Sequence, residues 1–129
     1  MTKKIKKISN LVKTFNGVKI AFAINGENLK AKIALHFGRA NNFLIYDTET
    51  KTSNVYPNPE ATGESQLPPD FLHSQGVDVI VVFSLGPMAF NKFKNYNIKM
   101  YKAIQGSILE NIKKLEKGNL GGLKKEDIF

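Results

Sequence analysis

The chain has 129 residues, the size of one ordinary domain, so its length excludes two packed domains. No apolar run approaches the roughly 18 residues of a transmembrane helix, and the lysine-rich start lacks the apolar stretch of a secretory signal. A formal net charge of +8 favours an anionic partner, whereas the absence of cysteine excludes disulfides and thiolate metal sites and is compatible with a cytoplasmic protein.

Residues 1–17 are predicted to be a basic N-terminal extension, because they hold five lysines and no acidic residue. Apolar side chains at intervals of three to four residues favour a short amphipathic helix or a frayed tail, and Asn16-Gly17 leaves a hairpin turn as the alternative. Since lysine clusters bind phosphates, a nucleic-acid-binding module acting through this segment is one hypothesis for the function. Against it, Phe15 is the segment's one aromatic side chain for base stacking.

Residues 18–120 are predicted to form one folded domain in which strands and helices alternate. Nearly continuous apolar runs predict buried strands over 18–24 and 77–83, and the second of these is expected in the middle of the sheet. A polar connection of hairpin length joins predicted strands over 43–46 and 53–56, and a last strand is expected over 98–101.

Three helices are expected between or after these strands. Proline marks the first turn of a helix opening at Pro68-Pro69 and of another opening at Gly86-Pro87. The second helix is expected to turn three apolar side chains, Met88, Phe90 and Phe93, toward the sheet. A third helix follows Ser107, which has the capping-box spacing with Glu110. Residues 121–129 show no periodicity and are predicted to be a flexible C-terminal tail.

This element order predicts a three-layer α/β/α sandwich, because a hairpin is added to one side of two right-handed crossover units. Ligands of such sheets bind beyond the carboxyl ends of the parallel strands. Here that edge is expected to consist of the segments that follow Ile24, Phe83 and Tyr101.

The block His36-Phe37-Gly38-Arg39 joins one of two histidines to the one arginine of the chain. Imidazole is a metal ligand and guanidinium is a planar fork of donors, so the pair could bind an anionic or metal-containing ligand. The structural alternative is a turn in which His36 caps, Phe37 enters the core and Gly38 satisfies the backbone.

Other chemistry has less support in the sequence. Gly86-Pro87 would place backbone amides and a helix N-terminus at the ligand edge, although the same residues also suit an ordinary strand-to-helix turn. His73 lies near the end of a predicted helix, where a structural role is expected. Two histidines without paired carboxylates do not make a three-ligand catalytic metal site, and no serine stands in a nucleophile elbow. The sequence therefore contains no enzyme motif.

The strand at 18–24, followed by His36-Phe37-Gly38-Arg39-Ala40 and the strand starting at Phe43, resembles the dinitrogenase iron-molybdenum cofactor-binding family. The segments 76–80, 86–89 and 98–101 follow in the family's order and spacing, so that the resemblance covers about residues 18–120. It implies a ribonuclease-H-like fold with a five-stranded mixed sheet in the order 3-2-1-4-5, strand 2 being antiparallel.

The resemblance also implies a non-catalytic carrier of an iron-sulfur or iron-molybdenum cofactor or its precursor. The family's cofactor-contacting histidine matches His36, which is the expected metal ligand. Phe37, Gly38 and Arg39, together with Gly86-Pro87, complete the expected cofactor-binding residues. A preassembled anionic cluster needs one imidazole, cations and amide donors rather than four thiolates. Cofactor donor and acceptor proteins are the expected partners, and the chain is expected to be a monomer or weak dimer.

Overall fold

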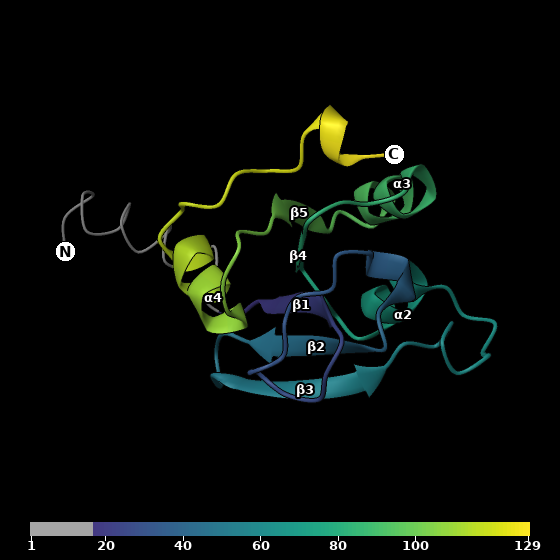
Figure 1. Ribbon diagram of the computed structural model, residues 1–129, viewed down its shortest axis with the longest axis horizontal. Helices are drawn as coiled ribbons and strands as arrows, with labels where there is room; N and C mark the ends of the chain where they lie inside the picture. Colours follow the sequence, from purple (N-terminus) through teal and green to yellow (C-terminus); the bar gives the residue numbers. More distant parts are fainter. Residues whose placement is uncertain (1–16) are drawn as a thin grey trace.

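The computed structural model describes residues 17–129, so the predictions for residues 1–16, including the hypothesis of nucleic-acid binding, lie outside the described part of the chain. The strands form one five-stranded sheet, and Figure 1 shows helices on both of its faces. The strands are β1 (Lys19–Ile24), β2 (Asn42–Asp47), β3 (Thr52–Pro57), β4 (Val79–Val82) and β5 (Lys99–Lys102). The helices are α2 (Pro68–Ser74), α3 (Pro87–Asn95) and α4 (Ile108–Glu116), with 3-10 turns η1 (Phe37–Arg39) and η2 (Lys125–Asp127).

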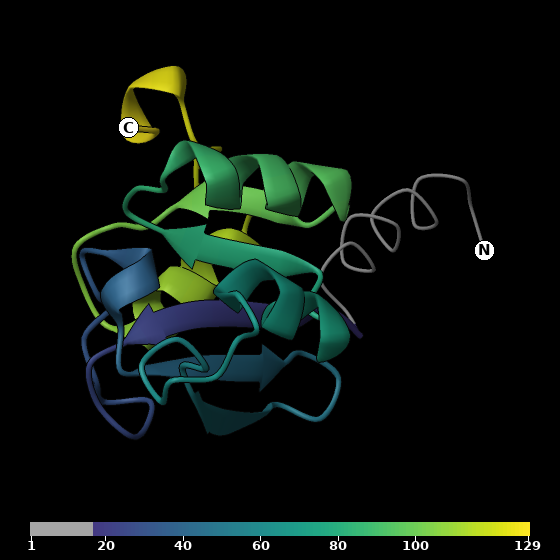
Figure 2. The same ribbon diagram turned by 90° about the vertical axis from the view of Figure 1, so that its right-hand side faces the viewer.

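The sheet has the order β3-β2-β1-β4-β5, which confirms the predicted order. β1 lies in the middle, antiparallel to β2 and parallel to β4, so the strand expected in the middle, β4, is an inner strand one place away, between β1 and β5. β2 also pairs antiparallel with β3, and β4 pairs parallel with β5. β1, β4 and β5 therefore end at the same edge of the sheet, which Figure 2 shows together with η1 and the C-terminal segment.

The residues of β1 alternate between the two faces of the sheet, as the geometry of a strand requires. Ala21 and Ala23 belong to the hydrophobic cluster that contains Leu72 of α2 and Phe93 of α3. Their neighbours Ile20, Phe22 and Ile24 belong to the opposite cluster, which contains three apolar residues of α4, Ile108, Ile112 and Leu115. The two clusters explain why β1 is apolar from Ile20 to Ile24, and they give the α/β/α layers expected from the element order.

α4 begins with the predicted capping box. The Ser107 hydroxyl accepts a hydrogen bond from the amide of Glu110 at 3.0 Å, and the Glu110 carboxylate accepts one from the amide of Ser107 at 2.9 Å. These hydrogen bonds hold the pKa of the Glu110 carboxyl below its usual value. The local sequence signal and the observed cap therefore agree.

The prediction that Met88 faces the sheet was wrong, because its side chain is 56% exposed. Phe93 is fully buried, and Ala89 and Phe90 pack against the same cluster. Ala89 and Phe90 lie four and three residues before Phe93, which places them beside it on the helix, whereas Met88 is five residues before Phe93 and lies on another face.

The C-terminal segment differs from the flexible tail that the sequence predicts. Gly122 forms an antiparallel bridge with Tyr101 of β5, and Ile128 forms a parallel bridge with Leu85. The Lys102 ammonium lies 2.6 Å from the Asp127 carboxylate. Backbone pairing and this ion pair place residues 121–129 along β5 and beside the start of α3. Isolated backbone bridges do not require a periodic arrangement of apolar side chains, so the sequence of this segment shows none.

Candidate functional site

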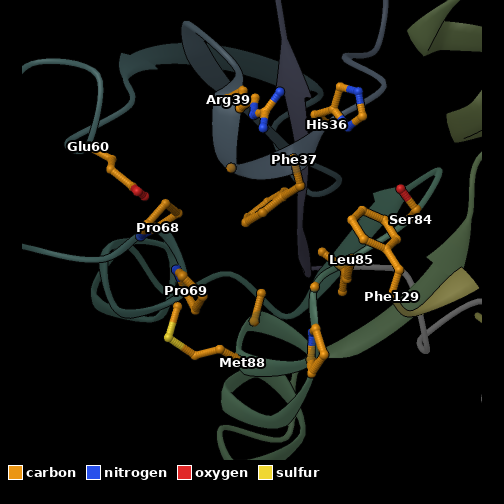
Figure 3. A pocket seen from close by; sticks show the side chains of 14 residues that line it. His36, Phe37, Arg39, Glu60, Pro68, Pro69, Ser84, Leu85, Met88 and Phe129 are labelled. Atoms are coloured by element: carbon orange, nitrogen blue, oxygen red, sulfur yellow. The ribbon is translucent and has the colours of Figure 1, made fainter.

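A pocket of about 370 Å³ lies at the carboxyl edge of the sheet, on the side of α2 and α3. Its volume is in the range of small-molecule pockets. It brings together all six residues singled out in the sequence: His36, Phe37, Gly38, Arg39, Gly86 and Pro87. Figure 3 shows His36 and Arg39 on one side of the pocket and Met88 on the opposite side.

Phe37 anchors η1 to the core. Its side chain is 6% exposed, and its ring centroid lies 5.2 Å from that of Phe43 on β2 and 5.4 Å from that of Phe93 on α3. The buried ring stabilises the turn through its contacts with both of these aromatic rings and through the burial of its apolar surface. Phe37 therefore forms the floor of the pocket, while the residues on either side of it are held at the surface.

His36 and Arg39 are both exposed. His36 occupies the N-cap position of η1, but its side chain makes no capping hydrogen bond. Within residues 17–129, neither side chain is recorded in a hydrogen bond or ion pair with another residue. The alternative that His36 serves as a cap is therefore wrong, and the imidazole and guanidinium groups are left available to a ligand.

Gly38 and Gly86 line the pocket without being required by the backbone. Neither has a positive φ angle, and a Cβ atom added to Gly38 would meet no atom within 4 Å. A Cβ atom added to Gly86 would have its nearest neighbour, the carbonyl oxygen of Phe129, at 4.0 Å. The alternative that Gly38 satisfies the backbone is not what the structure shows; the absent side chain instead leaves open space in the pocket wall.

The N-terminus of α3 lies in the pocket wall. Gly86 is the N-cap residue and provides no side-chain cap, and the first turn contains no acidic residue. The first amides of a helix have no partner within the helix, and they carry the positive end of its dipole. Residues 86–89 of this end all line the pocket, so the uncapped end is directed at the space beside His36 and Arg39.

Glu60 is the one acidic residue of the lining, and it formally balances Arg39. Figure 3 places Glu60 beside Pro68, on the far side of Arg39 from His36. Arg39, His36 and the start of α3 therefore lie in the part of the pocket away from the Glu60 carboxylate.

Sequence reasoning missed several lining residues. Pro68, Pro69, Ser84, Leu85, Ala89 and Phe129 line the pocket with Glu60 and Met88. Ser84 and Leu85 belong to the segment after Phe83, which was expected at the ligand edge, although these two were not named as site residues. Phe129 has no such signal, because its place depends on the pairing of Ile128 with Leu85.

The segment after β5 lies at the carboxyl edge of the sheet, as expected, but it lines a different pocket from the candidate site. Gln105, Gly106 and Ser107 line a second pocket of about 530 Å³, together with residues 30–33, Leu35 and Phe83. Leu35 and His36 are consecutive in the chain but line different pockets. The loop between β1 and β2 therefore separates the two pockets at this edge.

His73 lies outside both of these pockets, on α2. Its ring stacks on Tyr96, with 3.9 Å between the centroids. Tyr96 donates a hydrogen bond to Asp70, and Lys92 forms an ion pair with the same carboxylate at 3.1 Å. These hydrogen bonds, that of Tyr96 above all, lower the pKa of Asp70. The cluster joins α2 to α3, as expected for a structural rather than a ligating histidine.

The donor set limits which metal species the site fits. Within residues 17–129, no group of three or more histidine, cysteine, aspartate or glutamate side chains could hold a metal ion. A bare ion needs several such ligands, whereas a preassembled cluster carries most of its own ligands.

Within residues 17–129, no helix is long and apolar enough to cross a membrane.

Comparison with known proteins extends over most of the chain. Residues 18–118 match the model of the family described as dinitrogenase iron-molybdenum cofactor. The uncharacterized protein MJ0580 of Methanocaldococcus jannaschii is 32% identical over an alignment of 109 residues, and the match covers 80% of this chain and 89% of that protein.

Solved structures share the fold. The apo form of the orange protein from Desulfovibrio gigas has a TM-score of 0.72 at 22% identity, covering 81% of this chain and 92% of that one. A NifB-like protein from Thermotoga has a TM-score of 0.71 at 30% identity, covering 82% and 93%. The match over residues 18–118 shows that the chain belongs to the dinitrogenase iron-molybdenum cofactor family.

Proposed function

We propose that this protein is a non-catalytic carrier that binds an anionic iron-sulfur or iron-molybdenum type cluster, or its precursor, as cargo. His36 is the metal ligand, Arg39 is the charge partner, and the cluster rests in the pocket between η1 and the start of α3. The observation that carries the proposal is that an imidazole and a guanidinium without partners in the described chain meet an uncapped helix end at a pocket.

The pocket suits a large anion better than a small hydrated one. Most of its lining is apolar, including Phe37, Leu85 and Phe129. A sulfide-rich cluster spreads its charge over many polarisable atoms, so it loses less hydration on entering such a pocket than phosphate does. Arg39 and the first amides of α3 then supply donors to its sulfide atoms.

A single protein ligand is consistent with transfer rather than storage. One imidazole bond is broken more readily than four thiolate bonds, and all other contacts are electrostatic or apolar. We therefore include in the proposal donor and acceptor proteins that exchange the cluster with this chain, which acts as a monomer or weak dimer.

The test is retention of a synthetic thiolate-ligated iron-sulfur cluster under strict anaerobiosis. Wild-type protein is expected to retain cluster through desalting, as measured by its iron and sulfide content. His36→Ala is expected to retain about 10- to 100-fold less, the range seen when groups that hold a metal site are altered.

His73→Ala is the matched control, because it removes the other histidine from a site distant from the pocket. It is expected to retain cluster as the wild type does. Equal retention by wild type and His36→Ala would exclude His36 as the ligand, and failure of the wild type to retain cluster would refute the proposed function.

A further inference from the structure

We propose that Asn58 is the positioning residue of the candidate site, holding the backbone on both sides of Arg39 so that Arg39 and His36 face the pocket. Its effect on ligand binding rests on the proposed function, whereas its effect on the loop does not. Asn58 follows β3 between Pro57 and Pro59, and its side chain is fully buried.

The side-chain amide of Asn58 is directed at η1. Its Nδ2 atom donates to the carbonyl oxygen of Ala40 at 2.9 Å and to that of Gly38 at 3.3 Å. These two carbonyls flank Arg39 in the chain. One buried amide therefore holds the peptide group that precedes Arg39 and the carbonyl of the residue that follows it.

The other polar atoms of Asn58 hold the facing wall. Its Oδ1 atom accepts a hydrogen bond from the amide of Glu60 at 3.0 Å, and its own backbone amide donates to the carbonyl of Asn41 at 3.0 Å. One side chain thus forms hydrogen bonds both with the wall that contains Arg39 and with the wall that contains Glu60.

η1 needs this support because its own hydrogen bonds are few. It is a single 3-10 turn, in which the amide of Arg39 lies 3.2 Å from the carbonyl of His36 and the amide of Ala40 lies 3.4 Å from that of Phe37. Turns of this kind have poorer hydrogen-bond geometry than α-helices. The buried ring of Phe37 attaches the turn to the core at one point, which does not determine the orientation of the turn. The hydrogen bonds of Asn58 attach it at a second point.

The contacts specify an amide at position 58. The side chain uses two N–H donors and one oxygen acceptor, and the amide of asparagine provides all three. Aspartate has the same shape but would direct a carboxylate at two carbonyl oxygens, and serine is too short to reach both. A fully buried polar group that loses its partners destabilises the local structure.

Asn111 offers a matched control in the same protein. It is also fully buried, and its Nδ2 atom donates to the carbonyls of Ile104 and Ser107 at 3.1 Å and 2.9 Å while its Oδ1 atom accepts from the amide of Ile104 at 2.9 Å. It holds the connection between β5 and α4, which lines the second pocket and not the candidate site. Substitution of Asn111 removes a set of hydrogen bonds similar to that of Asn58, but in the connection between β5 and α4 rather than at η1.

The experiment compares Asn58→Asp and Asn58→Ser with Asn111→Asp and Asn111→Ser. Three quantities are measured: the free energy of unfolding, the backbone amide NMR shifts of residues 36–40 without ligand, and retention of the synthetic iron-sulfur cluster. Both pairs are expected to lower stability to a similar degree. The Asn58 variants alone are expected to shift residues 36–40 and to bind cluster about 10- to 100-fold more weakly. If the aspartate variants do not fold, the comparison is made with the serine variants alone.

Two results would overturn the proposal. One is unchanged NMR shifts of residues 36–40 in the Asn58 variants. The other is an equal loss of cluster binding in the variants at Asn58 and Asn111, which would reveal a general effect of stability. If wild-type protein binds no cluster, the proposed function fails, and the NMR shifts alone decide whether Asn58 positions the loop.

Discussion

His36 and Arg39 are displayed at the surface while Phe37, one of the two residues between them, is buried. The ring of Phe37 contacts Phe43 and Phe93, so the turn cannot move away from the core without exposing an aromatic side chain. Such burial is worth about 1.5–3 kcal/mol. A structural role for Phe37 and a binding role for its neighbours are therefore compatible, although at the level of the sequence they are alternatives.

A glycine in a pocket wall can be required either by the backbone conformation or by the space that a ligand needs, and substitution of Gly38 distinguishes the two. Gly38→Ala is expected to leave the free energy of unfolding within about 0.5 kcal/mol of the wild type, because the φ angle is ordinary and the added methyl group meets no atom. The same methyl group narrows the pocket, so retention of the synthetic cluster is expected to fall. Chemical denaturation and iron analysis measure the two effects.

Gly76→Ala is the control for Gly38→Ala. Gly76 has a φ angle of +77°, a conformation that costs an alanine about 1–2 kcal/mol. We expect this variant to lose stability but to retain cluster. A stability loss in Gly38→Ala as large as that in Gly76→Ala would contradict the assignment of Gly38 to ligand space.

At the scale of elements, α2 and α3 are joined by the polar cluster around Asp70 as well as by the core. The hydrogen bond from Tyr96 and the ion pair with Lys92 depress the pKa of Asp70, and the same hydrogen bond raises the pKa of Tyr96. A carboxyl whose pKa is lowered in the folded state contributes stability above its ordinary pKa of about 4 and loses this contribution as the pH falls through the folded value.

Asp70→Asn is therefore expected to be less stable than the wild type at neutral pH. The difference should shrink on acidification below about pH 4, where the wild-type carboxyl becomes protonated. Urea unfolding at a series of pH values measures this change. Glu64→Gln, at an exposed carboxylate, is the control. A stability difference that is the same at every pH would exclude the charge of Asp70 as its cause.

Elements with a local signal could be predicted, and those that depend on distant contacts could not. The apolar runs of β1 and β4 and the spacing of Ser107 and Glu110 are local features, and the structure contains the corresponding strands and cap. The sequence shows Asn58 as a strand-breaking residue between prolines. Its hydrogen bonds to Gly38 and Ala40 bridge 18 to 20 residues, and no local pattern encodes such a contact.

At the scale of the whole molecule, the C-terminal segment completes the rim of the candidate site. The amide of Phe129 donates to the carbonyl of Leu85 at 3.1 Å, and the amide of Leu85 donates to the carbonyl of Asp127 at 3.0 Å. The hydrogen bond from Lys102 is the main cause of the low pKa of Asp127. Phe129, which is 67% exposed, is thus held at the pocket by its backbone rather than by burial of its ring.

Asp127→Asn is expected to loosen this rim, because the amide carries no charge to pair with Lys102. Hydrogen exchange measured by NMR should become faster at the amides of Leu85 and Phe129, while that of Phe22 in β1 should not change. Glu126→Gln, at the neighbouring exposed residue, should leave all three rates as they are in the wild type. Unchanged exchange at Leu85 in Asp127→Asn would show that the ion pair does not hold the segment.

The pairing of residues 121–123 with β5 also bears on self-association. An uncovered edge strand presents unpaired amides and carbonyls that can recruit another chain into a continuous sheet. Here the amide of Lys102 donates to the carbonyl of Gly121 at 2.8 Å and the amide of Leu123 donates to that of Met100, so the chain occupies its own edge. The opposite edge, β3, ends at Pro57 and exposes polar Thr52 and Asn54. The segment that shapes the pocket rim therefore also protects the molecule against aggregation through its sheet.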